Sequence, residues 1–276
     1  MNFKQHLPAV FATLAAMLMA ILWVFPLLWA ALTSLKPESQ TVAQPIVWIP
    51  TPPTLQAYLE VITLGNLPRW YVNSTLVTLI VTVLTVVLST GAAYAFSQLR
   101  FPGRNALFVF ALLGFYLPFE VMLIPLFKQM FALGLFNSLP AIILPQLVAP
   151  ATIYVFKGFF DQIPREYREA ATLDGANEFT LLTRVYVPLA GNILWAMAIV
   201  TFIGAWNNFL WPFIITNSAE LFTVPLGLTQ VQDSYGVRNA RLMAAAMLGA
   251  LPMMVLYLVF QKRVMQGFLT AAGIKG

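Results

Sequence analysis

Long apolar runs with almost no charge limit the fold of this chain more than any other feature. Residues 7–32 and 71–96 contain no Asp, Glu, Lys or Arg. In the whole chain 9% of residues are charged and 60% are hydrophobic, whereas soluble domains are about 25% charged. Runs of this length favour helices in lipid, because a membrane helix satisfies its own backbone hydrogen bonds. The chain is therefore predicted to be an all-α polytopic membrane protein.

Six stretches are apolar enough to be predicted as transmembrane helices, which need about 20 such residues. These spans are approximately 7–32, 71–96, 106–127, 139–156, 187–216 and 242–260. The first exceeds the roughly 7–15-residue apolar core of a signal peptide, so it is predicted to stay in the protein. Residues 1–276 are expected to form a single transmembrane domain. A short interfacial helix is expected over 55–64, and a tail over 261–276.

The basic residues predict the orientation of the chain. With six spans both termini lie on one side of the membrane. Ten of the fifteen Lys and Arg residues fall on that side, in the two terminal segments, the link near Arg100 and the segment between the fourth and fifth spans. Because cytoplasmic loops are enriched in Lys and Arg, both termini are predicted to be cytoplasmic.

One polar segment, residues 159–191, interrupts the apolar pattern and holds five of the ten acidic residues. Its pattern predicts two short helices, the first capped by Asp161 and the second capped by Asn177 and ended by Pro188. Gly175 is expected to supply a left-handed turn between them. On this pattern alone, a solvated amphipathic loop is the alternative interpretation.

The residue order of the segment resembles the EAA loop of ABC importer permeases. The matching positions are Glu169-Ala170-Ala171, Gly175 and Val185-Tyr186-Val187-Pro188, although the family more often has Ile and Leu at 185 and 187. The stretches PREYREAATLDGA, FIGAWNNFLWPFI and GFLTAAGIKG resemble the maltose-type carbohydrate permeases, and the similarity covers essentially the whole chain. The resemblance implies a type I ABC importer permease fold with a cytoplasmic coupling helix in the loop 161–188.

The resemblance also implies partners and contact residues. The coupling loop would dock on an ATPase subunit through Glu169, Ala170, Ala171, Asp174, Gly175 and Pro188. The tail would reach the ATPase through Thr270, Gly273, Lys275 and Gly276. The expected partners are a second permease subunit, a dimer of ATPase subunits that bind ATP and Mg, and an extracytoplasmic solute-binding protein, in a bacterial inner membrane.

Several classes of chemistry are missing from the sequence. It has no G-x-x-x-x-G-K-[ST] phosphate-binding motif, no H-E-x-x-H motif, no cysteine and a single histidine, His6. The chain is therefore expected to bind no cofactor or metal of its own, to have no catalytic residues and to bind no nucleic acid. Energy for active transport would have to come from another subunit.

Three polar residues within the predicted spans are candidates for the translocation path. Glu120 lies fourteen residues into the third span, about 21 Å of helix rise from its inner end. A carboxylate at that depth should face a wet cavity or a partner such as Lys128 or Arg241. Asn207 and Asn208 in the fifth span would contact a hydroxylated solute or join helices by hydrogen bonds.

The sequence therefore predicts a permease subunit of an ABC importer for a sugar or related polyol. An importer permease for another solute, such as an amino acid or phosphorylated polyol, is the nearest alternative. A channel or an intramembrane enzyme is a more distant one, because the sequence indicates neither a symmetric homo-oligomer nor a catalytic set.

Overall fold

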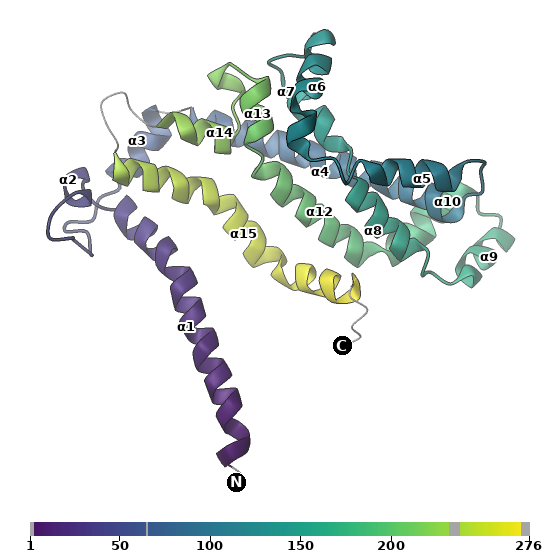
Figure 1. Ribbon diagram of the computed structural model, residues 1–276, viewed down its shortest axis with the longest axis horizontal. Helices are drawn as coiled ribbons and strands as arrows, with labels where there is room; N and C mark the ends of the chain where they lie inside the picture. The colour runs from purple at the N-terminus through teal and green to yellow at the C-terminus, as the bar shows by residue number, and fades with distance from the viewer. Residues whose placement is uncertain (1–2, 65, 232–237, 272–276) are drawn as a thin grey trace. The chain divides into compact units, whose positions relative to one another are not determined.

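A computed structural model describes residues 3–64, 66–231 and 238–271, and these residues form helices joined by loops, with no strand among them (Figure 1). Contacts group the chain into two compact units, and the single transmembrane domain expected over 1–276 stays a prediction. One unit contains residues 1–68 and 227–252, and the other contains residues 69–226 and 253–276.

The first unit contains the N-terminal helix and the loop after it. Its helices are α1 (Phe3–Ser34), α2 (Glu38–Thr41), α3 (Gln56–Leu64) and the first part of α15 (Asn239–Ala271). Polar contacts join α2 and α3 to the start of α15: Ala240 donates its backbone N–H to Glu38 of α2 at 3.2 Å, and Arg238, the residue before α15, pairs with Glu60 of α3 at 3.3 Å. The position of α3 agrees with the short helix expected over 55–64.

The second unit contains most of the other helices. They are α4 (Leu67–Gln98), α5 (Arg104–Leu113), α6 (Phe119–Ala132), α7 (Leu139–Ile143), η1 (Leu144–Leu147), α8 (Pro150–Phe160), α9 (Arg165–Leu173), α10 (Glu178–Leu181), η2 (Leu182–Tyr186, a π-helical turn), α11 (Val187–Leu189), α12 (Gly191–Trp206), α13 (Leu210–Ile215) and η3 (Ala219–Leu221). The turns α14 (Val224–Leu228) and η4 (Thr229–Val231) lie near the boundary between the units.

Within the described residues, three single helices are long and apolar enough to cross a membrane: Val10–Ser34, Leu67–Gln98 and Asn239–Gln261. Two bent pairs raise the number to five if each pair is one span. These are Leu139–Leu147 with Pro150–Phe160, bent by 42°, and Glu178–Leu189 with Gly191–Trp206, bent by 81°. The predicted total of six spans stays a prediction.

The third predicted span, 106–127, contains Pro118 and Pro125, and the structure forms it from two separate helices. Helix α5 ends at Leu113, and α6 begins at Phe119 after an irregular stretch. Gly114 and Pro118 bound that stretch. Because Pro118 has no N–H and disfavours helical backbone before it, the chain leaves the helix there and restarts afterwards.

Two further boundaries also differ from the expected ones. The fifth predicted span, 187–216, is divided into α11, α12 and α13, with non-helical backbone at 207–209. The expected tail, 261–276, is not a separate segment at its start, because α15 continues without a break to Ala271. Both differences concern where helices end, which apolar composition alone does not specify.

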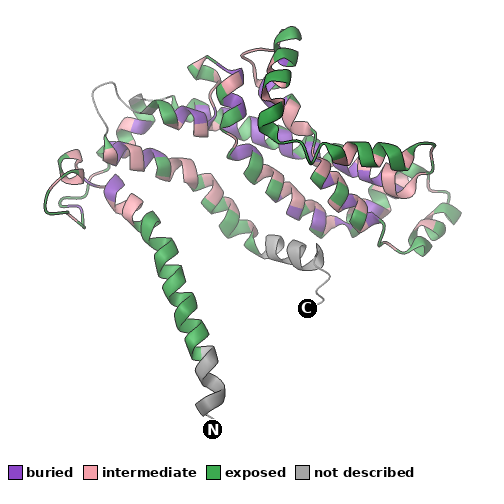
Figure 2. Cartoon of the chain, in the orientation of Figure 1, coloured by how far each residue is buried: buried purple, intermediate pink, exposed green. Residues whose placement is uncertain are grey.

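An aromatic core connects the helices at one end of the second unit. Tyr94 of α4, Phe160 of α8 and Tyr186 of η2 pack edge to face, with ring centroids 5.1 to 6.4 Å apart. All three side chains are nearly or fully buried, and Leu181 packs into the same cluster. Figure 2 shows both buried and exposed residues along α8 and α12. Through Leu181 and Tyr186, the core therefore holds the polar segment against helices α4 and α8.

Candidate functional site

The polar segment begins with α9, whose start differs from the expected one. Pro164 occupies the position before the helix, and no side chain caps α9. The expectation that Asp161 caps it was wrong. Asp161 instead ends α8, where its carboxylate accepts hydrogen bonds from Lys157 Nζ at 2.7 Å and from Ser97 Oγ at 2.6 Å. Asp161 thus joins the end of α8 to α4.

Helix α9 ends in a Schellman motif, as the expected left-handed glycine requires. Gly175 has a φ of +81°. Its N–H donates to the carbonyl of Thr172 at 3.0 Å, and the N–H of Ala176 donates to the carbonyl of Ala171 at 3.0 Å. Ala171 and Ala176 also pack against the aromatic core. Asn177 then caps α10 by accepting from the Thr180 N–H at 2.8 Å, as predicted.

A three-residue polar bracket ties α9 to α10 and α4. Arg168 of α9 forms an ion pair with Glu178, and it donates to Tyr94 Oη at 3.2 Å. Tyr94 in turn donates to Glu178 at 2.5 Å. Burial disfavours the charged guanidinium, but the hydrogen bonds and charge interactions with Glu178 and Tyr94 together outweigh burial and raise the pKa of Arg168. The guanidinium of Arg168 therefore stays protonated at all ordinary pH values.

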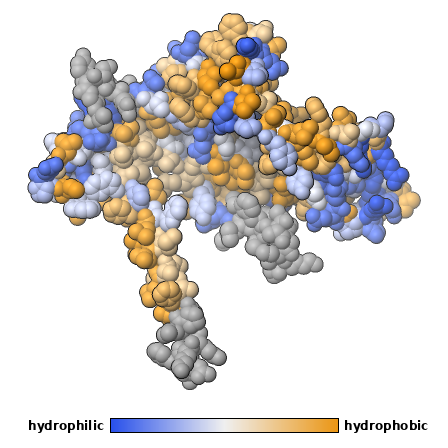
Figure 3. All heavy atoms as spheres, in the orientation of Figure 1, coloured by the Kyte–Doolittle hydropathy of each residue, from blue (hydrophilic) through white to orange (hydrophobic). Residues whose placement is uncertain are grey.

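The other face of α9 is exposed. Glu169 and Ala170 lie on this face, and no hydrogen bond or ion pair joins the Glu169 side chain to another described residue. Ala171, expected beside Ala170 on the contact face, is instead half-buried against the core. Figure 3 shows hydrophilic atoms gathered around α9, in contrast to the apolar surface over α5.

Apolar side chains also protrude from the segment. Leu173, at the end of α9, is 89% exposed, and Phe179 of α10 is 74% exposed. Exposed apolar groups beside charged ones are typical of a docking surface. Leu173 was not among the candidates. Its position in the last turn of α9, opposite the half-buried Ala171, is the signal that identifies it.

The predicted coupling residues are only partly brought together. Asp174 and Gly175 are exposed at the turn, directly after the Glu169–Ala170 face. Pro188 is also exposed, but it lies in α11, and the helix ends one residue beyond it at Leu189. The exposed surface of the segment therefore centres on α9 and its turn.

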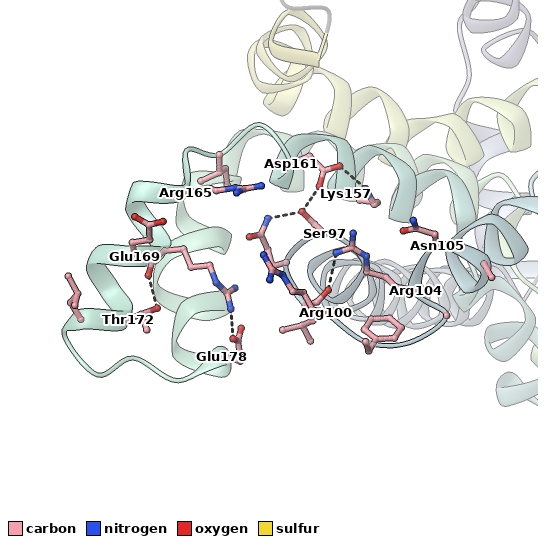
Figure 4. A pocket seen from close by; sticks show the side chains of 18 residues that line it. Ser97, Arg100, Arg104, Asn105, Lys157, Asp161, Arg165, Glu169, Thr172 and Glu178 are labelled. Carbon is pink, nitrogen blue, oxygen red and sulfur yellow. Dashed lines mark hydrogen bonds and ion pairs between the residues drawn. The ribbon is translucent and has the colours of Figure 1, made fainter.

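A cleft of about 1740 Å³ separates α9 from the link that joins α4 to α5 (Figure 4). Ser97, Arg100, Arg104 and Lys157 line one side, and Arg165, Glu169 and Thr172 of α9 line the other. In the part of the chain that the structure describes, no group of three or more His, Asp or Glu residues is placed to hold a metal ion.

Glu120 lies in the first turn of α6, directly after the break that divides the third predicted span. Its side chain is exposed, and the ion pairs of the described residues do not include it, so the alternative of a pair with Lys128 or Arg241 is not found there. The straight-helix depth of about 21 Å does not apply, because α5 and α6 are separate helices. Whether Glu120 lines a path stays a prediction.

The two asparagines have different surroundings. Asn207 is exposed and donates to the carbonyl of Ile203 in its own helix at 3.0 Å. Asn208 donates to Gln146 Oε1 at 2.9 Å and so joins the break after α12 to η1. Of the tail candidates, Thr270 lies in α15, whereas Gly273, Lys275 and Gly276 lie outside the described residues.

A profile of the family described as binding-protein-dependent transport system inner membrane component matches residues 86–268. The chain belongs to this family. The chain is 35% identical to the arabinooligosaccharides transport system permease protein AraQ of Bacillus subtilis, over 96% of this chain and 95% of that protein. It is 32% identical to the trehalose/maltose transport system permease protein MalG of Thermococcus litoralis, over 99% of both chains.

The fold of this inner membrane component is that of a solved transporter. It matches a crystal structure of a bacterial ABC transporter involved in the import of the acidic polysaccharide alginate. The TM-score is 0.85, with 20% identity over 95% of this chain and 98% of that one. The predicted type I permease fold is confirmed, and the inner membrane component is a multi-pass membrane protein. It is a transport component and not itself an enzyme, as expected.

Proposed function

We propose that this chain is the permease subunit of an ABC importer for a sugar or related polyol. It forms the translocation path with a second permease subunit and receives solute from an extracytoplasmic binding protein. Separate ATPase subunits bind ATP and Mg and drive the cycle. Family membership supports the transport role, and the printed names of AraQ and MalG support the carbohydrate class.

One observation carries the mechanism: α9 is firmly held on one side and exposed on the other. The Arg168–Glu178–Tyr94 bracket holds one side, while Glu169, Ala170 and Leu173 are exposed. A helix presented this way suits docking into a groove on a partner. Small Ala170 lets the partner approach closely, Leu173 offers apolar area, and Glu169 offers a carboxylate to a basic residue.

Coupling then follows from the anchoring. Closure of the ATPase subunits on ATP moves α9, and the contacts of α9 with α4 and α10 transmit that movement to the permease body as rigid-body gating. Both ends of the chain and the 161–188 loop lie in the cytoplasm in this mechanism, where ATP is present. The tail from Thr270 onward adds a second ATPase contact.

The proposal is tested by purifying the chain with its partner subunits and measuring recovery of ATPase and solute uptake. Glu169→Lys places a positive charge against the partner's basic residue. Like charges at an interface cost several kcal/mol, so recovery of the ATPase should fall about tenfold or more. Insertion into the membrane should be unchanged, because Glu169 is exposed and has no ion-pair partner among the described residues.

Glu220→Lys is the matched control, because it makes the same charge change at an exposed glutamate predicted to lie on the opposite side of the membrane. Its ion pair with Arg69 is solvent-exposed and contributes little. If Glu169→Lys copurifies with the ATPase and transports like the control, α9 is not the coupling element.

A permease for a different solute is the second candidate function. The identity to the sulfoquinovosyl glycerol transport system permease protein SmoH of Agrobacterium fabrum, 34% over 95% of this chain, favours it specifically for an anionic glycoside. Uptake assays with neutral oligosaccharides and with anionic glycosides, using the assembled transporter with its solute-binding protein, separate the two.

A further inference from the structure

The cleft between α9 and the α4–α5 link carries an excess of positive charge. Five cationic side chains line it, against three acidic ones. Two of the cations are neutralised by ion pairs, Lys157 with Asp161 and Arg168 with Glu178. The remaining cations are Arg100, Arg104 and Arg165, and the remaining acid is Glu169. The cleft is therefore electrostatically suited to an anion.

The uncompensated charge is concentrated on the link side. Figure 4 shows Arg100 of the link together with Arg104 and Asn105 at the start of α5, and Glu169 and Thr172 across the cleft on α9. Arg104 donates one hydrogen bond to the Leu99 carbonyl at 3.0 Å, which fixes its side chain beside the link. Arg100 is exposed and has no ion pair with another described residue.

An apolar surface continues directly from these arginines along α5. Leu107, one turn beyond Arg104, is 52% exposed, and Phe110 is 72% exposed. Helix α5 has 10 residues, which rise about 15 Å. This is half of the roughly 30 Å hydrocarbon core of a bilayer. The exposed face of α5 therefore has the length of one leaflet, with two arginines at its polar end.

We propose that the link side of this cleft binds the phosphate headgroup of an anionic phospholipid, one acyl chain of which lies along the exposed face of α5. A guanidinium binds phosphate oxygens through paired N–H donors, and Asn105 adds an amide donor beside them. A single ligand with a charged head and an apolar tail matches both surfaces. An acidic segment of a soluble partner would match the arginines and leave α5 uncovered.

The test uses the full chain, purified in mild detergent with the subunits that accompany it. The protein is incubated with equal amounts of phosphatidylglycerol and phosphatidylcholine, and native mass spectrometry measures how much of each stays bound. Wild type should retain phosphatidylglycerol preferentially. Because an arginine near the membrane surface strengthens attachment to anionic lipid roughly fivefold, Arg100→Gln should lower the phosphatidylglycerol-to-phosphatidylcholine ratio by about that factor.

Two further variants make the result specific. Arg100→Lys keeps the charge and should keep most of the preference. Arg184→Gln removes a charge from an exposed position outside the cleft and should leave the ratio unchanged. Arg100 is the position of choice because Arg104 also holds the link through Leu99, so its removal would alter the backbone as well.

Three outcomes would overturn the proposal. Equal retention of both lipids by wild type would show that the cleft does not select an anionic headgroup. Displacement of phosphatidylglycerol by an excess of inorganic phosphate would show a phosphate site without the acyl contact along α5. An unchanged lipid ratio in Arg100→Gln, together with reduced recovery of the ATPase, would identify the cleft as a protein contact.

Discussion

Replacing Gly175 tests whether the turn after α9 depends on a left-handed residue. Gly175 has a φ of +81°, and no heavy atom lies within 4 Å of a Cβ added there. The cost of a side chain is therefore backbone strain and not a collision. A non-glycine residue in this conformation costs about 1–2 kcal/mol, with asparagine tolerated best and β-branched residues worst. We expect Gly175→Asn to destabilise the turn least, Gly175→Ala more and Gly175→Val most.

Hydrogen exchange of the turn measures this strain directly. The N–H groups of Gly175 and Ala176 donate to Thr172 and Ala171, so they exchange only when the turn opens. A penalty of about 1–2 kcal/mol in Gly175→Ala should raise their exchange rates roughly 5- to 30-fold. Recovery of the ATPase should fall in the same order as protection falls, since α9 is then presented in fewer molecules.

Gly158→Ala is the control, because Gly158 lies within helix α8 with open space around it. Gly158→Ala should leave the amide hydrogen-exchange rates of residues 165–176 unchanged. Unaltered protection in Gly175→Ala, or an asparagine variant as damaging as the valine variant, would refute the argument from the left-handed turn.

Three further predictions concern the rest of the chain. Reporter fusions after Ala43 and after Asn105 should read extracytoplasmic and cytoplasmic respectively, and the reverse result would also remove the basis for cytoplasmic docking. Glu120→Gln should leave the melting temperature unchanged while lowering solute uptake, because the carboxylate has no ion-pair partner among the described residues; a drop in melting temperature would instead reveal a structural role. Asn208→Leu should cost about 0.6–1.7 kcal/mol through its lost hydrogen bond to Gln146, and a double-mutant cycle that shows no coupling between them would contradict this.

The long helices and the glycine turn could be predicted because their causes are local. An uncharged run such as 71–96 leaves the backbone no alternative in lipid, and α4 covers it completely. Gly175 followed by Asn177 specifies the end of one helix and the start of another within a few residues. Such signals need no knowledge of distant contacts.

The helix breaks and the bracket could not be predicted in the same way. Prolines occur both inside membrane helices and at their ends. The sequence therefore does not distinguish Pro118, which stands at the start of α6 after a break, from Pro125, which lies within α6. Tyr94 lies 74 residues before Arg168, and nothing near either residue indicates that they meet. The pairing arises only after α4, α8 and η2 have packed around the aromatic core.

The bracket gives α9 a mechanical property that its sequence does not suggest. Arg168 is joined at once to a neighbouring turn and to a long membrane helix, through Glu178 and Tyr94. When a short helix is flanked by two flexible loops, the loops normally change conformation as the helix moves, and the movement does not reach the rest of the protein. Here a displacement of α9 is passed to α4 through three side chains in direct contact. The hydroxyl of Tyr94 is the point at which α9 and α10 are both joined to the membrane helix.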